Sequence, residues 1–116
     1  MALEIAFIGY NEAQTNTYFV DFAAVNADQV RRFDRRGGVI ILKDGTRITK
    51  VTPAPGFLKG RRFDQVILAD DRRMEILERR APELWALLLC CERSDVPPDF
   101  WFQTYDLDAE VPDENL

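Results

Sequence analysis

Arginine is the residue type whose number and spacing in this chain best suit a chemical task. Five arginine doublets, the last of them Arg79-Arg80, supply ten of the 15 basic residues. A guanidinium group offers a planar fork of donors to phosphate oxygens, so several doublets on one face would bind an anionic partner. We therefore expect an arginine-rich face that binds a protein or a polynucleotide. The candidate binding residues are Arg31, Arg32, Arg35, Arg36, Arg61, Arg62, Arg72 and Arg73.

The charges are divided unevenly along the chain. Residues 29–80 contain 14 of the 15 basic residues and seven acids. Outside them, in residues 1–28 and 81–116, every charged residue except Arg93 is an acid, and the net charge of the chain is -5. This division has two interpretations. Either the middle segment forms a basic face for an anionic partner, or the two acidic ends of the same chain neutralise it.

Carboxylates are the other side chains that could do chemistry, because histidine is absent and Ser94 is the only serine. These absences exclude Ser-His-Asp and Cys-His catalytic sets and the common zinc sites. Asp71 and Glu75 are spaced one helical turn apart and could hold Mg²⁺, but such pairs with arginines interleaved are more often a lattice of surface charges. We expect no cofactor, no metal site and no catalytic residues.

The segments KDGTRI (43–48), KGRRFD (59–64) and VILADD (66–71) follow one another in a characteristic order. Together they resemble the region around the Walker B strand of phage terminase and helicase ATPases, where a hairpin and an Arg-Gly step precede a hydrophobic run ending in Asp-Glu. The resemblance implies a small phage or prophage protein. It would match Asp70 to the magnesium-binding aspartate and place Asp71 where the catalytic glutamate belongs.

The chain departs from those ATPases because it has no G-x-x-x-x-G-K-[ST] loop to hold a triphosphate. ATP hydrolysis is therefore not expected. The favoured hypothesis is a non-enzymatic accessory or interaction protein of a phage or mobile element. The alternative is a degenerate nucleotide- or magnesium-dependent enzyme centred on Asp70 and Asp71.

The strand pattern predicts an α/β fold in a single domain, residues 1–105, with a mixed sheet of about four to five strands packed with three to four helices. Short apolar runs at 3–8, 39–42 and 66–69 predict strands, and the last is continuous enough to be buried on both faces. Asp44-Gly45 predicts a tight hairpin turn leading to a strand at 47–51. Residues 100–105 predict an added strand or a docked extended arm.

The helix predictions rest on caps and apolar faces. Residues 15–25 fit a helix or a strand, and the capping potential of Thr15 or Asn16 favours the helix. Asn26 and Gln29 resemble a capping box, which predicts a second helix that carries four of the arginines and ends at Gly37-Gly38. We expect a third helix after Asp70 and Asp71, one of which would cap it, and a fourth from Glu83 to about Arg93. The fourth has almost no polar face, so it should be largely covered, with Cys90 and Cys91 as buried thiols.

The last segment of the chain, residues 106–116, forms an acidic tail. Residues 106–116 contain five acids and little to bury, which predicts disorder. The tail would either shield the basic segment or only aid solubility.

No apolar run is long enough to cross a membrane, and the N-terminus lacks the positive region of a signal peptide, so we expect a cytoplasmic protein with no membrane partner.

Overall fold

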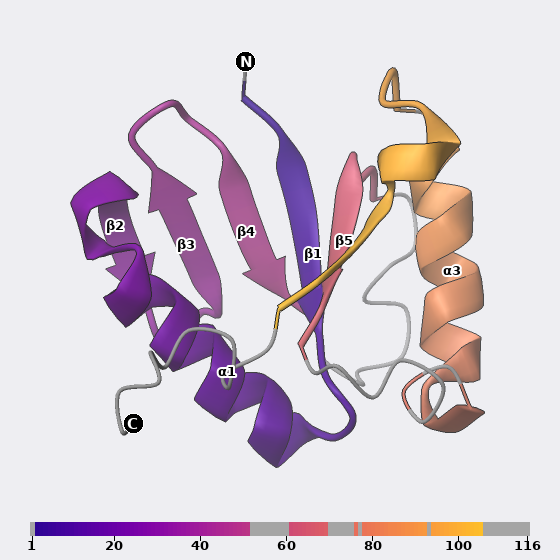
Figure 1. Cartoon of the computed structure of the whole chain (residues 1–116), viewed down its shortest axis with the longest axis horizontal. Coiled ribbons are helices and arrows are strands. Elements are labelled where there is room, and N and C mark those ends of the chain that lie inside the picture. The colour runs from indigo at the N-terminus through magenta and orange to yellow at the C-terminus, as the bar shows by residue number, and fades with distance from the viewer. Residues whose placement is uncertain (1, 52–60, 70–75, 77, 93, 106–116) are drawn as a thin grey trace, which may run out of the picture.

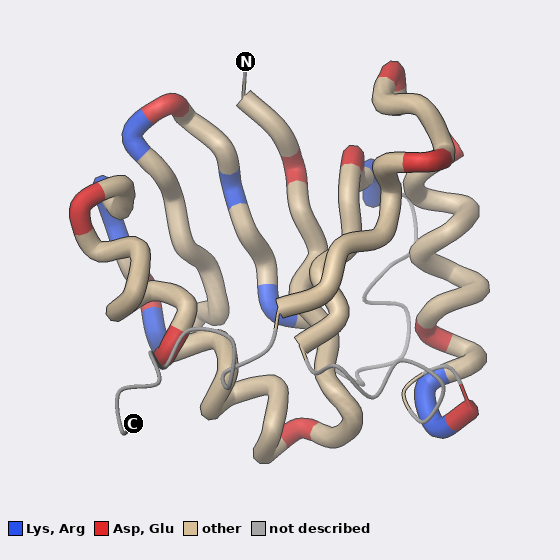
Figure 2. Tube along the Cα trace, viewed as in Figure 1, with Lys and Arg blue, Asp and Glu red and all other residues tan. Residues whose placement is uncertain are grey.

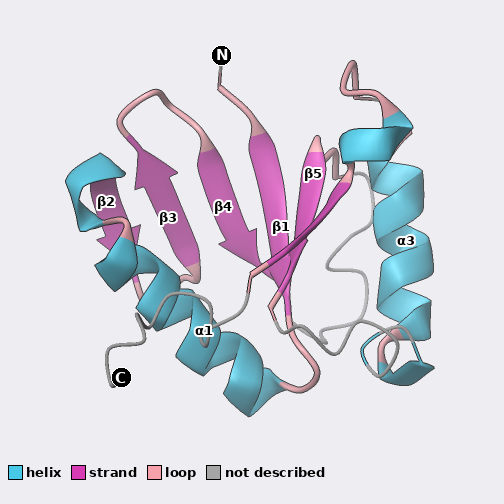
Figure 3. Ribbon diagram, in the orientation of Figure 1, coloured by secondary structure: helices cyan, strands magenta, loops and turns pink. Residues whose placement is uncertain are grey.

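The part of the chain that the structure describes forms layers, with helix α1 on one face of a central sheet and helix α3 on the other (Figures 1 and 3). The computed structural model describes residues 2–51, 61–69, 76, 78–92 and 94–105. In chain order the elements are β1 (Glu4–Ile8), α1 (Glu12–Val25), a 3₁₀ turn (Ala27–Gln29), β2 (Val30–Asp34), β3 (Val39–Leu42), β4 (Arg47–Lys50), β5 (Gln65–Leu68), α3 (Ala81–Cys91), a second 3₁₀ turn (Pro98–Phe100) and β6 (Phe102–Thr104).

The six strands form one mixed sheet in the order β2-β3-β4-β1-β5-β6. β1 pairs in parallel with β4 on one side and with β5 on the other, and β5 pairs in parallel with β6. β3 is antiparallel to both β2 and β4. Consequently the carboxyl ends of β2, β4, β1, β5 and β6 all lie along the same edge of the sheet, which we call the carboxyl edge.

The strands in the middle of the sheet are apolar on both faces because each face is covered. In β1, Ile5 and Phe7 face α1, whereas Ala6 and Ile8 belong to the core on the side of α3. β5 repeats this alternation with Ile67 on one side and Val66 and Leu68 on the other. The predictions of strands at 3–8 and 66–69, the latter buried on both faces, are confirmed.

The layer that contains α1 is rich in aromatic contacts. Phe19 of α1 packs edge-on against Phe7 of β1, with ring centroids 5.3 Å apart, and Phe22 lies 5.7 Å from the same ring. The helix predicted over residues 15–25 is confirmed, but it begins earlier, because Asn11 is the N-cap and its side chain accepts a hydrogen bond from the Gln14 amide at 2.7 Å. Thr15 is instead a buried residue inside the helix.

The hairpin and the last strand also follow the sequence prediction. Gly45 has φ of +93°, and Asp44 accepts a hydrogen bond from the Thr46 amide, as a tight turn between β3 and β4 requires. Residues 102–104 form β6 beside β5, so the alternating segment at 100–105 contributes a strand.

The predicted helix from Asn26 to Gly37-Gly38 is wrong. Asn26 ends α1 rather than beginning a new helix, since its side-chain amide donates to the Phe22 carbonyl oxygen at 2.9 Å. Residues 30–34 then form β2, paired with β3. Pairing with β3 overrides the local capping signal, and the β-branched and aromatic residues at 30 and 33 suit a strand. The exchange raises the sheet to six strands, against the four to five predicted, and removes one of the predicted helices. The complete α-helices within the described residues are α1 and α3.

Helix α3 is confirmed between residues 81 and 91, with Pro82 in its first turn, but it is not largely covered as expected. Leu84, Leu87, Cys90 and Cys91 are buried against the sheet, while Trp85 and Leu89, one turn apart on the opposite face, are 70% and 63% exposed. The helix covers the sheet with only one face, because it is the outermost element on its side of the described fold (Figure 1).

Both thiols of α3 are buried and free, as predicted. Burial raises the pKa of Cys91 to about 11, with the neighbouring Cys90 adding to the effect. Most of the predicted helix after Asp70 and Asp71 lies outside the described residues, but residues 76, 78 and 79, which are described, are helical. The predicted disorder of residues 106–116 lies outside the described residues. Neither of the two described α-helices has the length and apolarity to cross a membrane.

Candidate anion-binding pocket

A short turn between β2 and β3 presents two of the candidate arginines, Arg35 and Arg36. The Asp34 carboxylate accepts a hydrogen bond from the Gly37 amide at 2.8 Å, and the Asp34 carbonyl accepts one from the Gly38 amide at 2.9 Å. Gly38 has φ of +71°, a conformation that favours glycine. These bonds hold the turn in one shape and leave both arginine side chains exposed at the carboxyl edge.

Lys50, at the end of β4, adds a third cation to this turn. Its amide donates to the Gly38 carbonyl at 2.8 Å, which ties the end of β4 to the turn. A Cβ atom at Gly38 would lie 3.2 Å from Cε of Lys50, so the absence of a side chain there lets the lysine stem pass. The Lys50 ammonium donates a hydrogen bond to Oδ1 of Asn16 on α1, which fixes the charge between strand and helix.

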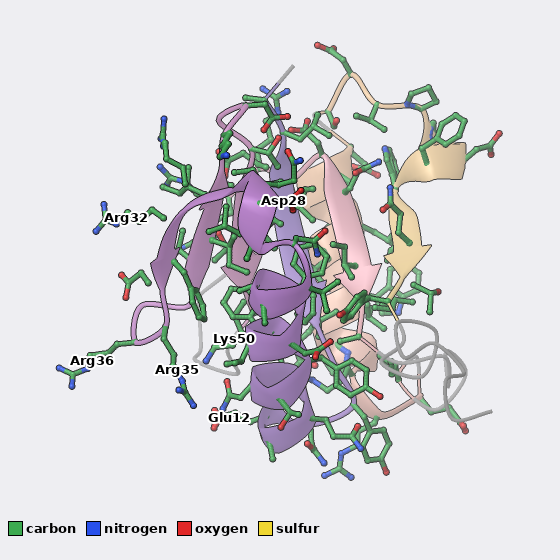
Figure 4. The ribbon with its side chains drawn as sticks, turned by 60° about the vertical axis from the view of Figure 1, so that its left-hand side comes forward. Glu12, Asp28, Arg32, Arg35, Arg36 and Lys50 are labelled. Atoms are coloured by element: carbon green, nitrogen blue, oxygen red, sulfur yellow. The ribbon has the colours of Figure 1, made fainter. Side chains whose placement is uncertain are left out.

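Together these residues line a pocket of about 740 Å³ between α1 and the β2–β3 turn. In Figure 4, Lys50 lies against α1, and Arg35 and Arg36 extend from the turn at the same end of the molecule. The basic pocket, as we call it, combines three cations with an amide, a hydroxyl and two apolar side chains that form part of its wall. Its lining residues are Asn16, Thr17, Phe19, Val20, Arg35, Arg36 and Lys50.

This arrangement suits an anion with several oxygens. Two guanidinium groups and one ammonium group supply charge-assisted donors, which bind phosphate oxygens more strongly than neutral donors do. Two acids moderate the field. Asp34 ends β2 and its carboxylate accepts a hydrogen bond within the turn, and Glu12 lies in the first turn of α1 (Figure 4). The five charges leave the surroundings of the pocket with one net positive charge.

The structure divides the other candidate arginines among separate places (Figure 2). Arg31 and Arg32 are exposed on β2, an edge strand of the sheet, at a point where the pairing with β3 shifts register. Charges and a bulge on an edge strand also hinder unwanted pairing with another chain, so this doublet has a structural explanation as well. Arg72 and Arg73 lie outside the described residues.

Arg61 and Arg62 precede β5 and therefore lie at the amino edge, opposite the basic pocket. Arg62 contacts the Asp64 carboxylate at 3.3 Å. Asp64 also accepts hydrogen bonds from the Glu4 amide at 2.8 Å and from the Ser94 hydroxyl at 2.6 Å. Burial alone would raise the pKa of Asp64, but these hydrogen bonds and the Arg62 charge outweigh it and hold the pKa below its ordinary value. Asp64 thus acts as a structural anion. It directly precedes β5, whereas Asp70 follows β5 in the sequence.

A second pocket, of about 610 Å³, lies at the ends of β1 and β4 near residues 78–80. Arg80 is buried beside it and donates to the Gly9 carbonyl at 3.0 Å, with its Nε 3.4 Å from Glu83. The Arg79 guanidinium lies 5.0 Å from the centre of the Tyr10 ring. Two acids, Glu12 and Glu78, also line this pocket, so its charges are balanced. Asp70 and Asp71 follow β5 in the sequence and lie outside the described residues.

Sequence reasoning identified Arg35 and Arg36 but missed Lys50, Asn16 and Thr17. Lys50 is an isolated base at the end of a strand. Asn16 is on a helix 34 positions earlier in the chain, and Thr17 follows it. Only the packing of α1 across β4 brings them together. No local pattern in the sequence could have shown this.

No family model matches this chain, and no curated protein or solved structure matches it either. The chemistry of the described residues is therefore the basis for inferring a function.

Proposed function

We propose that this protein is a non-enzymatic binding protein that recognises a polynucleotide through the basic pocket. The observation that carries the proposal is that Arg35, Arg36 and Lys50 line one pocket together with Asn16 and Thr17. The setting implied by the sequence resemblance, a phage or mobile element, belongs to the same proposal.

The pocket favours phosphate over carboxylate for a geometric reason. A phosphodiester presents two non-bridging oxygens that share one negative charge, and it repeats along the strand, so donors that diverge from one turn can engage one phosphate or two successive ones. Arg35 and Arg36 are adjacent on a fixed turn, and Lys50 is held in place by Asn16. Because this framework is already ordered, little conformational entropy of the backbone is lost on binding.

The net charge of -5 opposes this function at long range. Salt screens the repulsion over about 8 Å at physiological ionic strength, a distance within which the three cations of the pocket act. We therefore expect binding of moderate strength that depends on the local cations rather than on the overall field.

The test is fluorescence anisotropy of labelled oligonucleotides titrated with the protein at several salt concentrations. The double variant R35A/R36A and the single variant K50A should weaken binding at low salt. Each lost phosphate contact should also reduce the slope of log affinity against log salt by about 0.7 for a single strand. Arg47→Ala is the matched control, because Arg47 is exposed at the other end of β4.

Three results would count against the proposal. Binding could be absent at low salt, it could be insensitive to salt, or R47A could weaken it as much as K50A does. The last result would show a diffuse attraction of the whole surface rather than a site.

A second candidate function is a nucleotide- or magnesium-dependent activity centred on Asp70 and Asp71. The observation in its favour is the pocket at the carboxyl ends of β1 and β4, the edge at which open α/β sheets bind ligands. Titration with a fluorescent nucleotide, with and without Mg²⁺, tests it. Magnesium-dependent binding that is lost in both D70N and D71N would favour this candidate over the first.

A further inference from the structure

An apolar hollow of about 310 Å³ adjoins the basic pocket. It lies between α1 and the edge strand β2, and Val20 lines both cavities. Its other lining residues are apolar without exception: Ala23, Ala24, Ala27, Val30 and Phe33. The described surface therefore presents a cationic pocket and an apolar hollow side by side, which together fit a ligand that has an anionic group next to a flat apolar one.

Phe33 gives the hollow an aromatic wall. The residue is 36% exposed, and its ring lies at a 59° tilt against Phe19, with the ring centroids 6.0 Å apart. Phe19 is itself buried against Phe7 of the central strand. The Phe33 ring is thus supported by the core on one side, while part of it remains accessible. An aromatic ring supported in this way binds a flat partner with little loss of side-chain entropy.

We infer that the polynucleotide is single-stranded, and that one unstacked base enters the hollow against Phe33 while an adjoining phosphate lies in the basic pocket. The inference rests on the proposed function and adds the class of polynucleotide to it. Proteins that bind single strands combine a cationic groove with aromatic faces on which bases stack. Bases in a duplex are already stacked and paired, so they cannot enter a recess without being extruded first.

The charge of the neighbouring residues is what identifies the occupant. An apolar hollow alone would suit many ligands, but this one adjoins Arg35, Arg36 and Lys50, which favour an occupant that also carries an anionic group. A nucleotide unit joins a phosphate to a flat ring system in every repeat. A protein segment would need an acidic and an apolar side chain at matching positions, and it is therefore the outcome that the experiment has to separate.

The probes are a labelled oligothymidylate, an abasic oligomer of the same length and a duplex of the same length. The abasic oligomer keeps the phosphates and removes the bases. Phe33→Leu keeps an apolar side chain and removes the ring, whereas Phe33→Trp keeps a ring. Phe100→Leu is the matched control, because Phe100 is also exposed, at 60%, but lies in the 3₁₀ turn before β6. Thermal melts establish that each variant is folded.

The expected result is a loss of oligothymidylate affinity of about five- to 150-fold in F33L, the range that loss of one base–aromatic stack produces. F33W and F100L should bind like the wild type. F33L should leave the affinity for the abasic oligomer unchanged, and the duplex should bind the wild type more weakly than the single strand does.

The outcomes separate this inference from the proposed function. If the abasic oligomer and the oligothymidylate bind equally well through Arg35 and Arg36, the base does not enter the hollow, although phosphate binding stands. A duplex that binds as tightly as the single strand would overturn the inference in the same way. If no oligonucleotide binds, but an acidic peptide with apolar side chains binds and is weakened by F33L, both proposals fail and the partner is a protein.

Discussion

The hydroxyl group of Thr15 joins the end of β1 to the beginning of α1. It accepts a hydrogen bond from the Gly9 amide at 2.8 Å and donates one to the Asn11 carbonyl at 2.6 Å. A Cβ atom on Gly9 would lie 2.8 Å from the Thr15 hydroxyl oxygen, so the two segments approach this closely only with glycine at that position. The contact fixes the start of α1, and with it the positions of Asn16 and Thr17 in the basic pocket.

Replacing Thr15 with valine should destabilise the fold by about 1–3 kcal/mol, because the buried Gly9 amide would lose its acceptor while the side-chain volume is conserved. Urea unfolding measures the loss. Thr17→Val is the control, since Thr17 is exposed and its hydroxyl only donates to the Ala13 carbonyl of its own helix. Surface substitutions of this kind change stability by less than about 0.5 kcal/mol. Equal losses in the two variants would show that the Gly9 contact has no special weight.

Asp64 should make the stability of the fold depend on acidic pH. The pKa of Asp64 is lower in the folded protein than its ordinary value of 3.8. The unfolded chain therefore binds the proton more readily, and the stability that Asp64 contributes is present above pH 3.8 and is lost as the pH falls toward the folded pKa. Urea unfolding at a series of pH values from neutral to acidic measures this loss.

The variant D64N provides the comparison for that series. It should be less stable than the wild type at neutral pH by about 1.5–3 kcal/mol, the cost of losing hydrogen bonds to a charged group. The difference between the two proteins should shrink as the pH falls, because protonation removes the same charge from the wild type. Ser94→Ala should show a smaller version of the effect, since it removes one of the hydrogen bonds to Asp64. A difference that stays constant with pH would contradict the assignment.

The elements that could be predicted from the sequence are those whose signals are local. Continuous apolar runs predicted β1 and β5 correctly, since a strand covered on both faces needs no polar residue. Asp44-Gly45 gave the β3–β4 hairpin because few other pairs adopt that turn. Asn26 misled the prediction, because an asparagine beside a helix can end it as well as begin it. The pairing of residues 30–34 with β3 decided between the two, and the capping signal at Asn26 carries no information about that pairing.

The candidate site could be predicted only in part, because the strand order that brings its residues together leaves no local signal in the sequence. Arginine doublets are visible in the sequence, but whether two doublets share a face depends on the strand order. Arg35 and Arg61 are both beside strands, yet they lie at opposite edges of the sheet because one follows β2 and the other precedes β5. The hollow beside Phe33 could not be predicted either, since residues 30–34 were expected to be helical and instead form the strand β2 beside α1.

The segment 106–116 adds negative charge that opposes the binding of a polyanion. This segment holds five acids and no base, so its removal changes the net charge from -5 to 0. Because a polynucleotide is repelled by negative charge on the protein, the truncated chain should bind oligonucleotides more tightly than the full chain at low salt. The advantage should shrink as salt rises and the Debye length falls from about 30 Å at 0.01 M to about 8 Å at physiological ionic strength. Anisotropy titrations of both forms across that range measure it, with R35A/R36A in each background as the control that the gain acts through the basic pocket. Equal affinities at low salt would show that this segment neither competes with a polyanion nor repels it.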